Sequence, residues 1–180
     1  MSQKPLPSCY SENKDVSQSR DLSNAAHNRA AFFLSEPWGG PSMVNRGGEI
    51  KNCKERGEWA ELCFMARAAG LGLRVSKPDG DSASYDVGVE HNGKILRVQV
   101  KSTIYRRRGV ESYSLNVHGP RRQLYDKRAV DFFAVYLIPI DTWYILPFEK
   151  VGGNFSLHIT PGSKRQRYDR YREAWDLFRR

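Results

Sequence analysis

Residues 85–102, the stretch of the chain that decides its fold, read YDVGVEHNGKILRVQVKS. Apolar and polar residues alternate on both sides of Asn92-Gly93, a pair that favours a tight hairpin because both residues tolerate positive φ. Successive side chains of a strand point to opposite faces. The apolar face of this hairpin must pack on a core, so Asp86, Gln99 and Lys101 are expected together on the other face.

The three polar side chains of this face suit a site that hydrolyses phosphodiesters. Mg²⁺ prefers hard oxygen ligands and usually keeps several waters. Asp86 offers a carboxylate, Gln99 a side-chain carbonyl and Val100 a backbone carbonyl. Lys101 is placed to hold the attacking water or to offset charge that develops on the phosphate. The competing interpretation is a solvated strand, on which an Asp…Gln-x-Lys pattern is common.

An amphipathic helix is predicted upstream of the hairpin, over residues 54–69, with Gly70 at its C-terminal end. Apolar residues recur there at steps of three and four, and the predicted inward residues are Trp59, Leu62, Cys63, Ala66 and Ala69. Glu58 and Glu61 lie one turn apart on this helix. A carboxylate from the helix can reach the metal through water or complete a second metal site.

The remaining elements complete one α/β or α+β domain. Strands are expected over residues 71–76, 112–117, 129–140, 143–147 and 155–159, and helices over 121–127 and 166–180. The last helix has Tyr168, Tyr171, Trp175 and Phe178 as its inward residues. A helix, then a run of strands, then a helix is typical of such a domain. We assign it to residues 49–180, and we expect residues 1–48, rich in Ser, Asn, Gly and Pro, to form a poorly ordered extension.

The charge of the chain favours a polyanionic partner. The chain carries 29 Lys+Arg against 20 Asp+Glu, a formal net charge of +9, and such an excess is typical of proteins that bind nucleic acid. The basic residues predicted to contact DNA phosphates are Arg106, Arg107, Arg108, Arg121, Arg122, Lys164 and Arg165. The first three directly follow the lysine strand, Arg121 and Arg122 open a predicted helix, and the last two begin a basic segment. The alternative for each group is a solvated charged loop.

The sequence gives no indication of a membrane or secreted protein. The longest apolar run, residues 132–140, is far shorter than the ~18 residues that span a bilayer. Pro5, Pro7, Ser8 and Glu12 stand where a signal peptide needs an apolar core. The three cysteines are read as reduced thiols, so a cytoplasmic location is expected.

Four stretches together resemble the PD-(D/E)XK nucleases. They are residues 57–62 (GEWAEL), 74–78 (RVSKP), 85–87 (YDV) and 97–102 (RVQVKS). Residues 131–136 (DFFAVY) and 143–147 (WYILP) look like the later strands of a small subgroup, the homing endonucleases associated with group I introns. The layout of helix Glu, strand Asp and strand Lys is also similar to that of archaeal Holliday junction resolvases. The resemblance covers about residues 51–180.

The resemblance implies a restriction-endonuclease-like core, a mixed β-sheet flanked by helices, that cleaves double-stranded DNA with Mg²⁺, for which Mn²⁺ is an expected substitute. The family's helix glutamate falls on Glu61, its metal-binding aspartate on Asp86 and its lysine on Lys101. Most of the superfamily has Glu or Asp at the position of Gln99. The intron-associated subgroup resembles this chain in having Gln there. A neutral amide keeps the oxygen ligand but removes one negative charge. A homo-oligomer, dimer or tetramer, is also implied, because a palindromic cut needs two active sites.

Two other functions remain open on the sequence alone. One is a structure-specific nuclease of the Holliday-junction type or a repair nuclease. The other is a DNA-binding module whose nuclease site has decayed, for which Gln99 is the warning sign. Asp79 and Asp81 lie in a Gly- and Ser-rich turn and are interpreted as loop residues.

Overall fold

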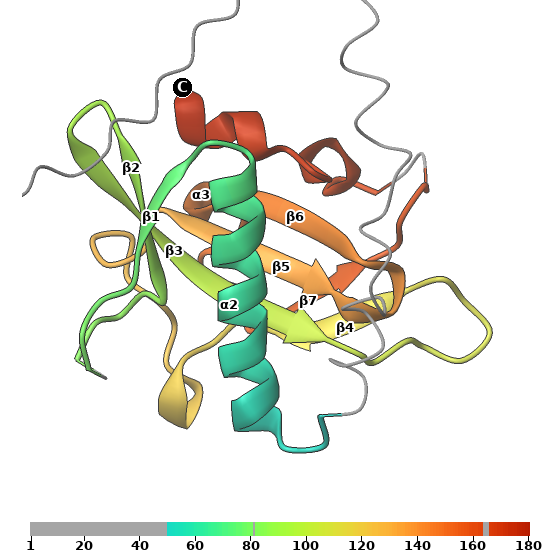
Figure 1. Cartoon of the computed structure of the whole chain (residues 1–180). Helices are drawn as coiled ribbons and strands as arrows, with labels where there is room; N and C mark the ends of the chain where they lie inside the picture. Colours follow the sequence, from blue (N-terminus) through green and yellow to red (C-terminus); the bar gives the residue numbers. More distant parts are fainter. Residues whose placement is uncertain (1–49, 81, 164–165) are drawn as a thin grey trace, which may run out of the picture. The chain divides into compact units, whose positions relative to one another are not determined.

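The computed structural model describes residues 50–80, 82–163 and 166–180 (Figure 1). The predicted extension over residues 1–48 therefore lies outside the described residues, as do Asp81, Lys164 and Arg165.

A five-stranded mixed sheet forms the centre of the fold, with strand order β1-β2-β3-β5-β6. Its strands are β1 (Arg74–Ser76), β2 (Val87–His91), β3 (Lys94–Thr103), β5 (Phe132–Leu137) and β6 (Thr142–Pro147). Neighbours are antiparallel except β3 and β5, which run parallel. Asn92 and Gly93 have φ of 48° and 72°, so the predicted hairpin between β2 and β3 is confirmed. The mixed sheet expected for the fold is confirmed as well.

A second sheet has two antiparallel strands, β4 (Tyr113–Asn116) and β7 (Ser156–Ile159), which pair with each other and not with strands of the first sheet. The strand predicted over residues 155–159 is thus present, but its partner is β4. A one-turn helix, α3 (Phe148–Val151), follows β6.

The helix α2 (Cys53–Gly70) begins one residue before the predicted start and ends at Gly70. The Asn52 side chain accepts hydrogen bonds from the backbone N–H groups of Lys54 and Glu55, which satisfies two donors at the start of the helix. At the other end Gly70 is still helical, and the left-handed residue is Gly72, with φ of 78°. Gly70 is thus the last helical residue, as the sequence predicts, but the left-handed glycine that follows the helix is Gly72 and not Gly70.

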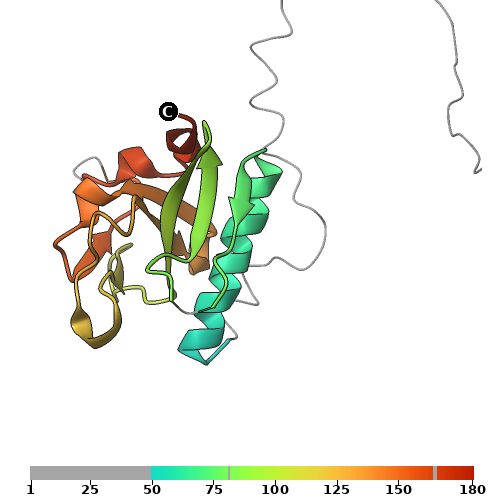
Figure 2. The ribbon, with the colours of Figure 1, turned by 90° about the vertical axis from the view of Figure 1, so that its left-hand side faces the viewer.

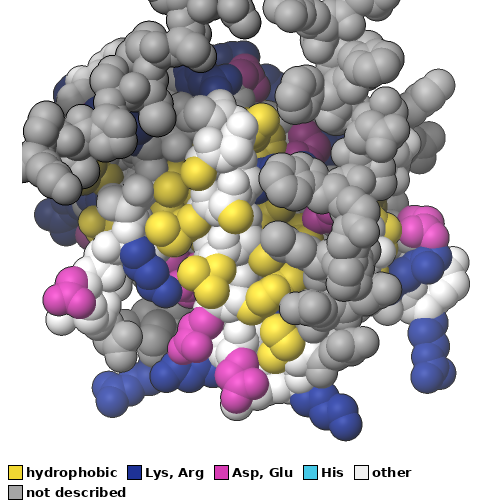
Figure 3. Space-filling model, viewed as in Figure 1, with side chains coloured by type: hydrophobic (Ala, Val, Ile, Leu, Met, Phe, Trp, Pro, Cys, Tyr) yellow, Lys and Arg dark blue, Asp and Glu magenta, His cyan; other side chains and the backbone are white. Residues whose placement is uncertain are grey.

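The buried face of α2 differs from the predicted one. Ala60, Phe64 and Ala68 are buried, whereas Leu62 is 60% exposed. Ala66 and Ala69 are exposed too, while Trp59 and Cys63 are partly buried and pack beside the buried row. Apolar residues extend around much of this helix, so steps of three and four fit more than one face. Apolar side chains consequently remain on the outer side of α2 (Figure 3).

Two apolar clusters cover the two faces of the main sheet. One contains α2 residues together with Val98, Val100, Ala134 and other side chains. The second contains Phe133 and Val135, along with residues of β4, β7 and α3. Seen from the side, α2 runs along one side of the sheet (Figure 2). Because apolar layers pack on both sides of β3, its polar face is partly covered by protein and not fully open to solvent.

The helices predicted over residues 121–127 and 166–180 are wrong. The first is a single 3₁₀ turn, Pro120–Arg122, in which Arg121 and Arg122 have positive φ. The second is two 3₁₀ turns, Asp169–Tyr171 and Trp175–Arg179. The four residues predicted to point inward from this segment, Tyr168, Tyr171, Trp175 and Phe178, are nevertheless all buried.

Glu173 accounts for the interrupted C-terminal segment. Its backbone N–H donates to the Trp143 carbonyl at 2.8 Å, and its carboxylate accepts from the Trp143 N–H and the Trp175 Nε1–H, both at 2.7 Å. These bonds tie the segment to β6 and hold Glu173 at a φ of 49°. They replace the local bonds of a helix.

In the part of the chain that is described, no helix is long and apolar enough to cross a membrane.

Candidate active site

Asp86 lies directly before β2, at the point where β2 and β3 begin to separate. Its backbone N–H donates to the Val98 carbonyl at 3.0 Å. The register pairs Val87 with Val98, which places Asp86 opposite Gln99. Residues opposite each other across antiparallel strands share a face and lie close together. The structure thus brings Asp86 and Gln99 together.

The Asp86 carboxylate is held by β3. Its Oδ2 atom accepts the Val100 backbone N–H at 2.7 Å and also accepts from the Gln99 side-chain amide. The N–H and C=O of one residue in an extended strand point to the same side. The Val100 carbonyl is therefore directed to the edge of β3 on which Asp86 lies, so three oxygen donors belong to one small region.

Burial changes the protonation of Asp86. Desolvation raises the pKa of Asp86 from 3.8 to about 6, and the nearby Glu61 carboxylate adds to the increase. The Val100 N–H and the charges of Lys101 and Lys77 oppose it. The ionised carboxylate is costly here without further positive charge. The site is therefore electrostatically suited to an added cation.

Glu61 reaches the site from α2 and is paired with Lys77. The Lys77 Nζ lies 2.8 Å from the Glu61 Oε2, and the Glu61 side chain is 18% exposed. Glu58, in contrast, is exposed and lies 3.9 Å from Lys54. The geometry favours Glu61 over Glu58 as the helix carboxylate of the site. Lys77 was not anticipated, although it is the only basic residue between β1 and Asp86.

Lys101 lies on the same face of β3 as Gln99, on the side of the sheet away from α2. This follows from the register with β5, which pairs Gln99 with Phe133 and Lys101 with Val135. The Lys101 Nζ donates to the Tyr125 hydroxyl at 3.0 Å. Tyr125 in turn packs edge-on against Phe133. No sequence pattern identifies Tyr125 as a residue of the site, because its loop contacts Lys101 only in the tertiary structure.

Gln99 is 5% exposed, so this face of β3 is more enclosed than the sequence suggests. Its amide N–H groups are directed to Asp86, because an amide oxygen would be repelled by the carboxylate. A turn of the amide exchanges its oxygen and nitrogen and presents the carbonyl to a cation instead.

The predicted phosphate-contacting residues are spread over the surface. Arg106, Arg107 and Arg108 are exposed in the loop after β3, and Arg106 pairs with Glu111. Arg121 and Arg122 are exposed as well, but the predicted helix N-terminus at these residues is wrong, since only one 3₁₀ turn forms. Arg122 instead lies 5.7 Å from the centre of the Phe155 ring.

The donor set fits a hard divalent cation. Two carboxylates, one amide carbonyl and one backbone carbonyl are the oxygen ligands that Mg²⁺ accepts, and room for waters is usual. Among the described residues no cluster of three His, Cys, Asp or Glu side chains could hold a metal. A softer ion such as zinc, which favours nitrogen and sulfur ligands, is not matched by these residues.

Comparison with known proteins identifies the family. The model of the PD-(D/E)XK endonuclease family matches residues 51–178. The chain belongs to the PD-(D/E)XK endonuclease family. The family and the restriction-endonuclease-like fold expected from the sequence are thereby confirmed.

Two solved structures are similar to this PD-(D/E)XK nuclease. A bacterial homing endonuclease, I-Ssp6803I, is 30% identical with a TM-score of 0.59, and the match covers 71% of this chain and 91% of that one. Hjc, a Holliday junction resolvase from Archaeoglobus fulgidus, is 15% identical with a TM-score of 0.40, over 58% and 84% of the two chains. The curated proteins contain no match.

We expect Lys77→Met to raise the pKa of Asp86 above about 6. Lys77 stabilises the ionised Asp86 and also neutralises Glu61, whose charge raises the Asp86 pKa. Both effects of the substitution therefore have the same sign. The measurement is a ¹³C NMR titration of the Asp86 carboxyl in the metal-free nuclease. Lys94→Met, at the exposed turn of the hairpin, is the matched control; equal titration curves for the two variants would contradict the expectation.

Proposed function

We propose that this nuclease is a Mg²⁺-dependent endonuclease that cuts double-stranded DNA at a specific site, as a homing endonuclease. The observation that carries the proposal is the Asp86–Gln99 pair with Lys101 on the next position of the same face. The similarity to I-Ssp6803I over 91% of that chain supports the homing activity.

Each residue of the site has a distinct task in this proposal. Asp86, Gln99, the Val100 carbonyl and Glu61 hold the cation. A bound Mg²⁺ supplies Lewis-acid polarisation of a phosphoryl oxygen and lowers the pKa of bound water. Lys101 supplies a fixed positive charge for the phosphate and the attacking water. Tyr125 holds the Lys101 ammonium in place through its hydroxyl oxygen.

Gln99 and Lys77 favour one ion over two. Gln99 contributes no negative charge, and the Glu61 carboxylate is already neutralised by the Lys77 ammonium 2.8 Å away. A second divalent ion gains little attraction at such a site. We further propose that residues 49–180 form the endonuclease domain and that two or four copies assemble, so that both DNA strands are cut.

The test is cleavage of a randomised linear duplex library in Mg²⁺, in Mn²⁺ and in EDTA, with a four-way junction as a second substrate. We expect one recurring linear sequence to be cut in Mg²⁺ and nothing in EDTA. Cleavage of the junction irrespective of its sequence would show a structure-specific nuclease and contradict the homing function. Tight DNA binding without any cleavage would show a decayed site, in which the Gln99 amide holds Asp86 in place of a cation.

A further inference from the structure

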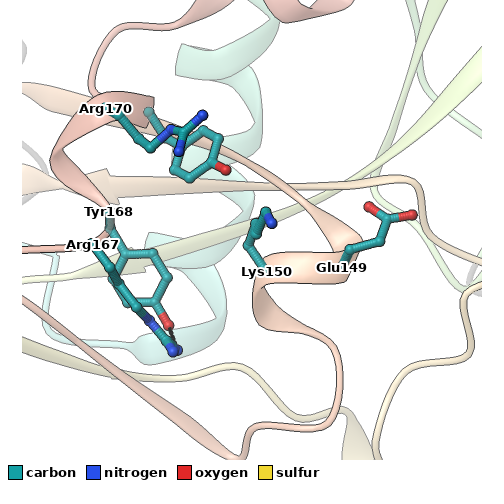
Figure 4. Close-up of a pocket in the computed structure, with 6 residues that line it drawn as sticks. Glu149, Lys150, Arg167, Tyr168 and Arg170 are labelled. Carbon is teal, nitrogen blue, oxygen red and sulfur yellow. Dashed lines mark hydrogen bonds between the residues drawn. The ribbon is translucent and has the colours of Figure 1, made fainter.

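A basic pocket that includes none of the active-site residues lies between α3 and residues 167–171, which contain the first C-terminal 3₁₀ turn (Figure 4). It has a volume of about 300 Å³ and is lined by Glu149, Lys150, Arg167, Tyr168, Arg170 and Tyr171. We propose that this pocket binds a backbone phosphate of the DNA substrate, outside the scissile bond. The proposal rests on the proposed function and extends its substrate contacts.

The pocket carries an excess of positive charge. Lys150, Arg167 and Arg170 contribute three cations, and among the described residues none of them forms an ion pair with a carboxylate. The one acidic lining residue, Glu149, is paired with Lys127 at 2.8 Å. Its carboxylate points away from the arginines in Figure 4. Three like charges repel one another at close range, so an anion between them is favoured.

The neighbouring Asp169 carboxylate is hydrogen-bonded within the protein. Its Oδ1 accepts the Tyr144 hydroxyl at 3.2 Å and the Gly162 N–H at 3.3 Å. Both donors are uncharged, so Asp169 keeps its negative charge, but among the described residues it forms no ion pair with Arg167 or Arg170.

Two tyrosines form a fixed floor under the arginines. The Arg167 guanidinium lies 4.5 Å from the centre of the Tyr168 ring, and that of Arg170 lies 5.3 Å from the Tyr171 ring. The rings are 4% and 7% exposed and belong to the second apolar cluster. Stacking restricts the guanidinium groups before a ligand arrives, which lowers the entropy cost of binding. A guanidinium held in this way presents paired N–H donors that match phosphate oxygens.

The pocket lies on the same side of the sheet as the catalytic lysine. Tyr168, Tyr171 and Val151 pack in the cluster that contains Val135, the β5 partner of Lys101. α2 covers the opposite side. A DNA backbone bound along this side can therefore meet the pocket and the cleavage site without passing around the molecule.

The experiment is DNA binding by the full chain without divalent metal, measured by fluorescence anisotropy across a salt series. Arg167→Ala/Arg170→Ala is expected to raise the dissociation constant roughly tenfold at low salt, irrespective of DNA sequence. The slope of log affinity against log salt should fall by about one for each phosphate that the variant no longer neutralises. Lys51→Ala/Lys54→Ala, at and just before the start of α2, removes the same charge from residues that do not line the pocket, so both quantities should change less.

Equal effects of the two double variants, or no effect of the pocket variant, would overturn the proposal. A change in sedimentation with unaltered DNA affinity would overturn it as well, because it would mark an acidic protein surface as the ligand. Absence of DNA binding by the unsubstituted chain has the same consequence. Since the assay involves no cleavage, failure of the proposed endonuclease activity leaves the pocket result interpretable by itself.

Discussion

Asp86→Asn is expected to raise the free energy of unfolding at pH 8 by up to about 3 kcal/mol and to abolish cleavage. Burial raises the pKa of Asp86 from 3.8 to about 6, so the folded protein binds this proton more tightly than the unfolded chain. Between these two pH values the wild type loses stability as pH rises, at about 1.4 kcal/mol per pH unit. Asparagine stays neutral and keeps an oxygen for the Val100 N–H, so the variant avoids this loss.

The stability difference between the wild type and Asp86→Asn is expected to depend on pH, which decides the conditions of the measurement. Below pH 3.8 Asp86 is protonated in both states, so the two proteins should differ little; above pH 6 the gain should be complete. Urea unfolding at about pH 4 and about pH 8 in EDTA measures both values. Added Mg²⁺ should stabilise the wild type and not the variant, because only the wild type retains the carboxylate ligand.

Asp126→Asn is the control for an aspartate-to-asparagine change. The pKa of Asp126 is lowered by its hydrogen bonds with Arg128, so this exposed residue should give no gain at high pH. An Asp86→Asn gain of equal size at both pH values would show that the stabilisation does not come from the buried charge.

Lys101→Met is expected to slow cleavage by about 10²–10³-fold while the nuclease still binds DNA, since loss of one positioned group that stabilises the transition state has an effect of this size. Methionine keeps the length and apolar contacts of the side chain but not its positive charge. Because the ammonium also lowers the pKa of Asp86, the variant should need a higher pH to bind metal. Single-turnover cleavage rates across a pH series, at saturating protein, give both quantities.

Lys94→Met is the matched control, because Lys94 begins the same strand and is exposed at the turn. It removes the same charge from β3 but should not change the cleavage rate. Cleavage by Lys101→Met within a few-fold of wild type would show that Lys101 has no catalytic part. A parallel loss of binding and cleavage would assign it to substrate binding alone.

The local sequence pattern was sufficient to predict the central hairpin. Asn92-Gly93 fixes the turn, and alternation fixes the faces, so the approach of Asp86 to Gln99 follows from residues 85–102 before any tertiary contact is considered. The helix was predictable too, because apolar residues recur along it. Its buried face was not predictable, since Phe64 is selected by the ring positions of Trp143, Trp175 and Phe178.

The sequence by itself determined the strand pair and the face shared by Asp86, Gln99 and Lys101, because both depend on short-range turn chemistry and strand parity. The family followed from the resemblance of several short stretches, which the family model confirms. Only the tertiary structure decided the partners of the charged groups. Lys77 meets Glu61 and Lys101 meets Tyr125 across separate elements. The C-terminal segment likewise gives up a helix because Glu173 bonds to Trp143 on β6. Such contacts join residues far apart in the chain, where no periodicity relates one to the other.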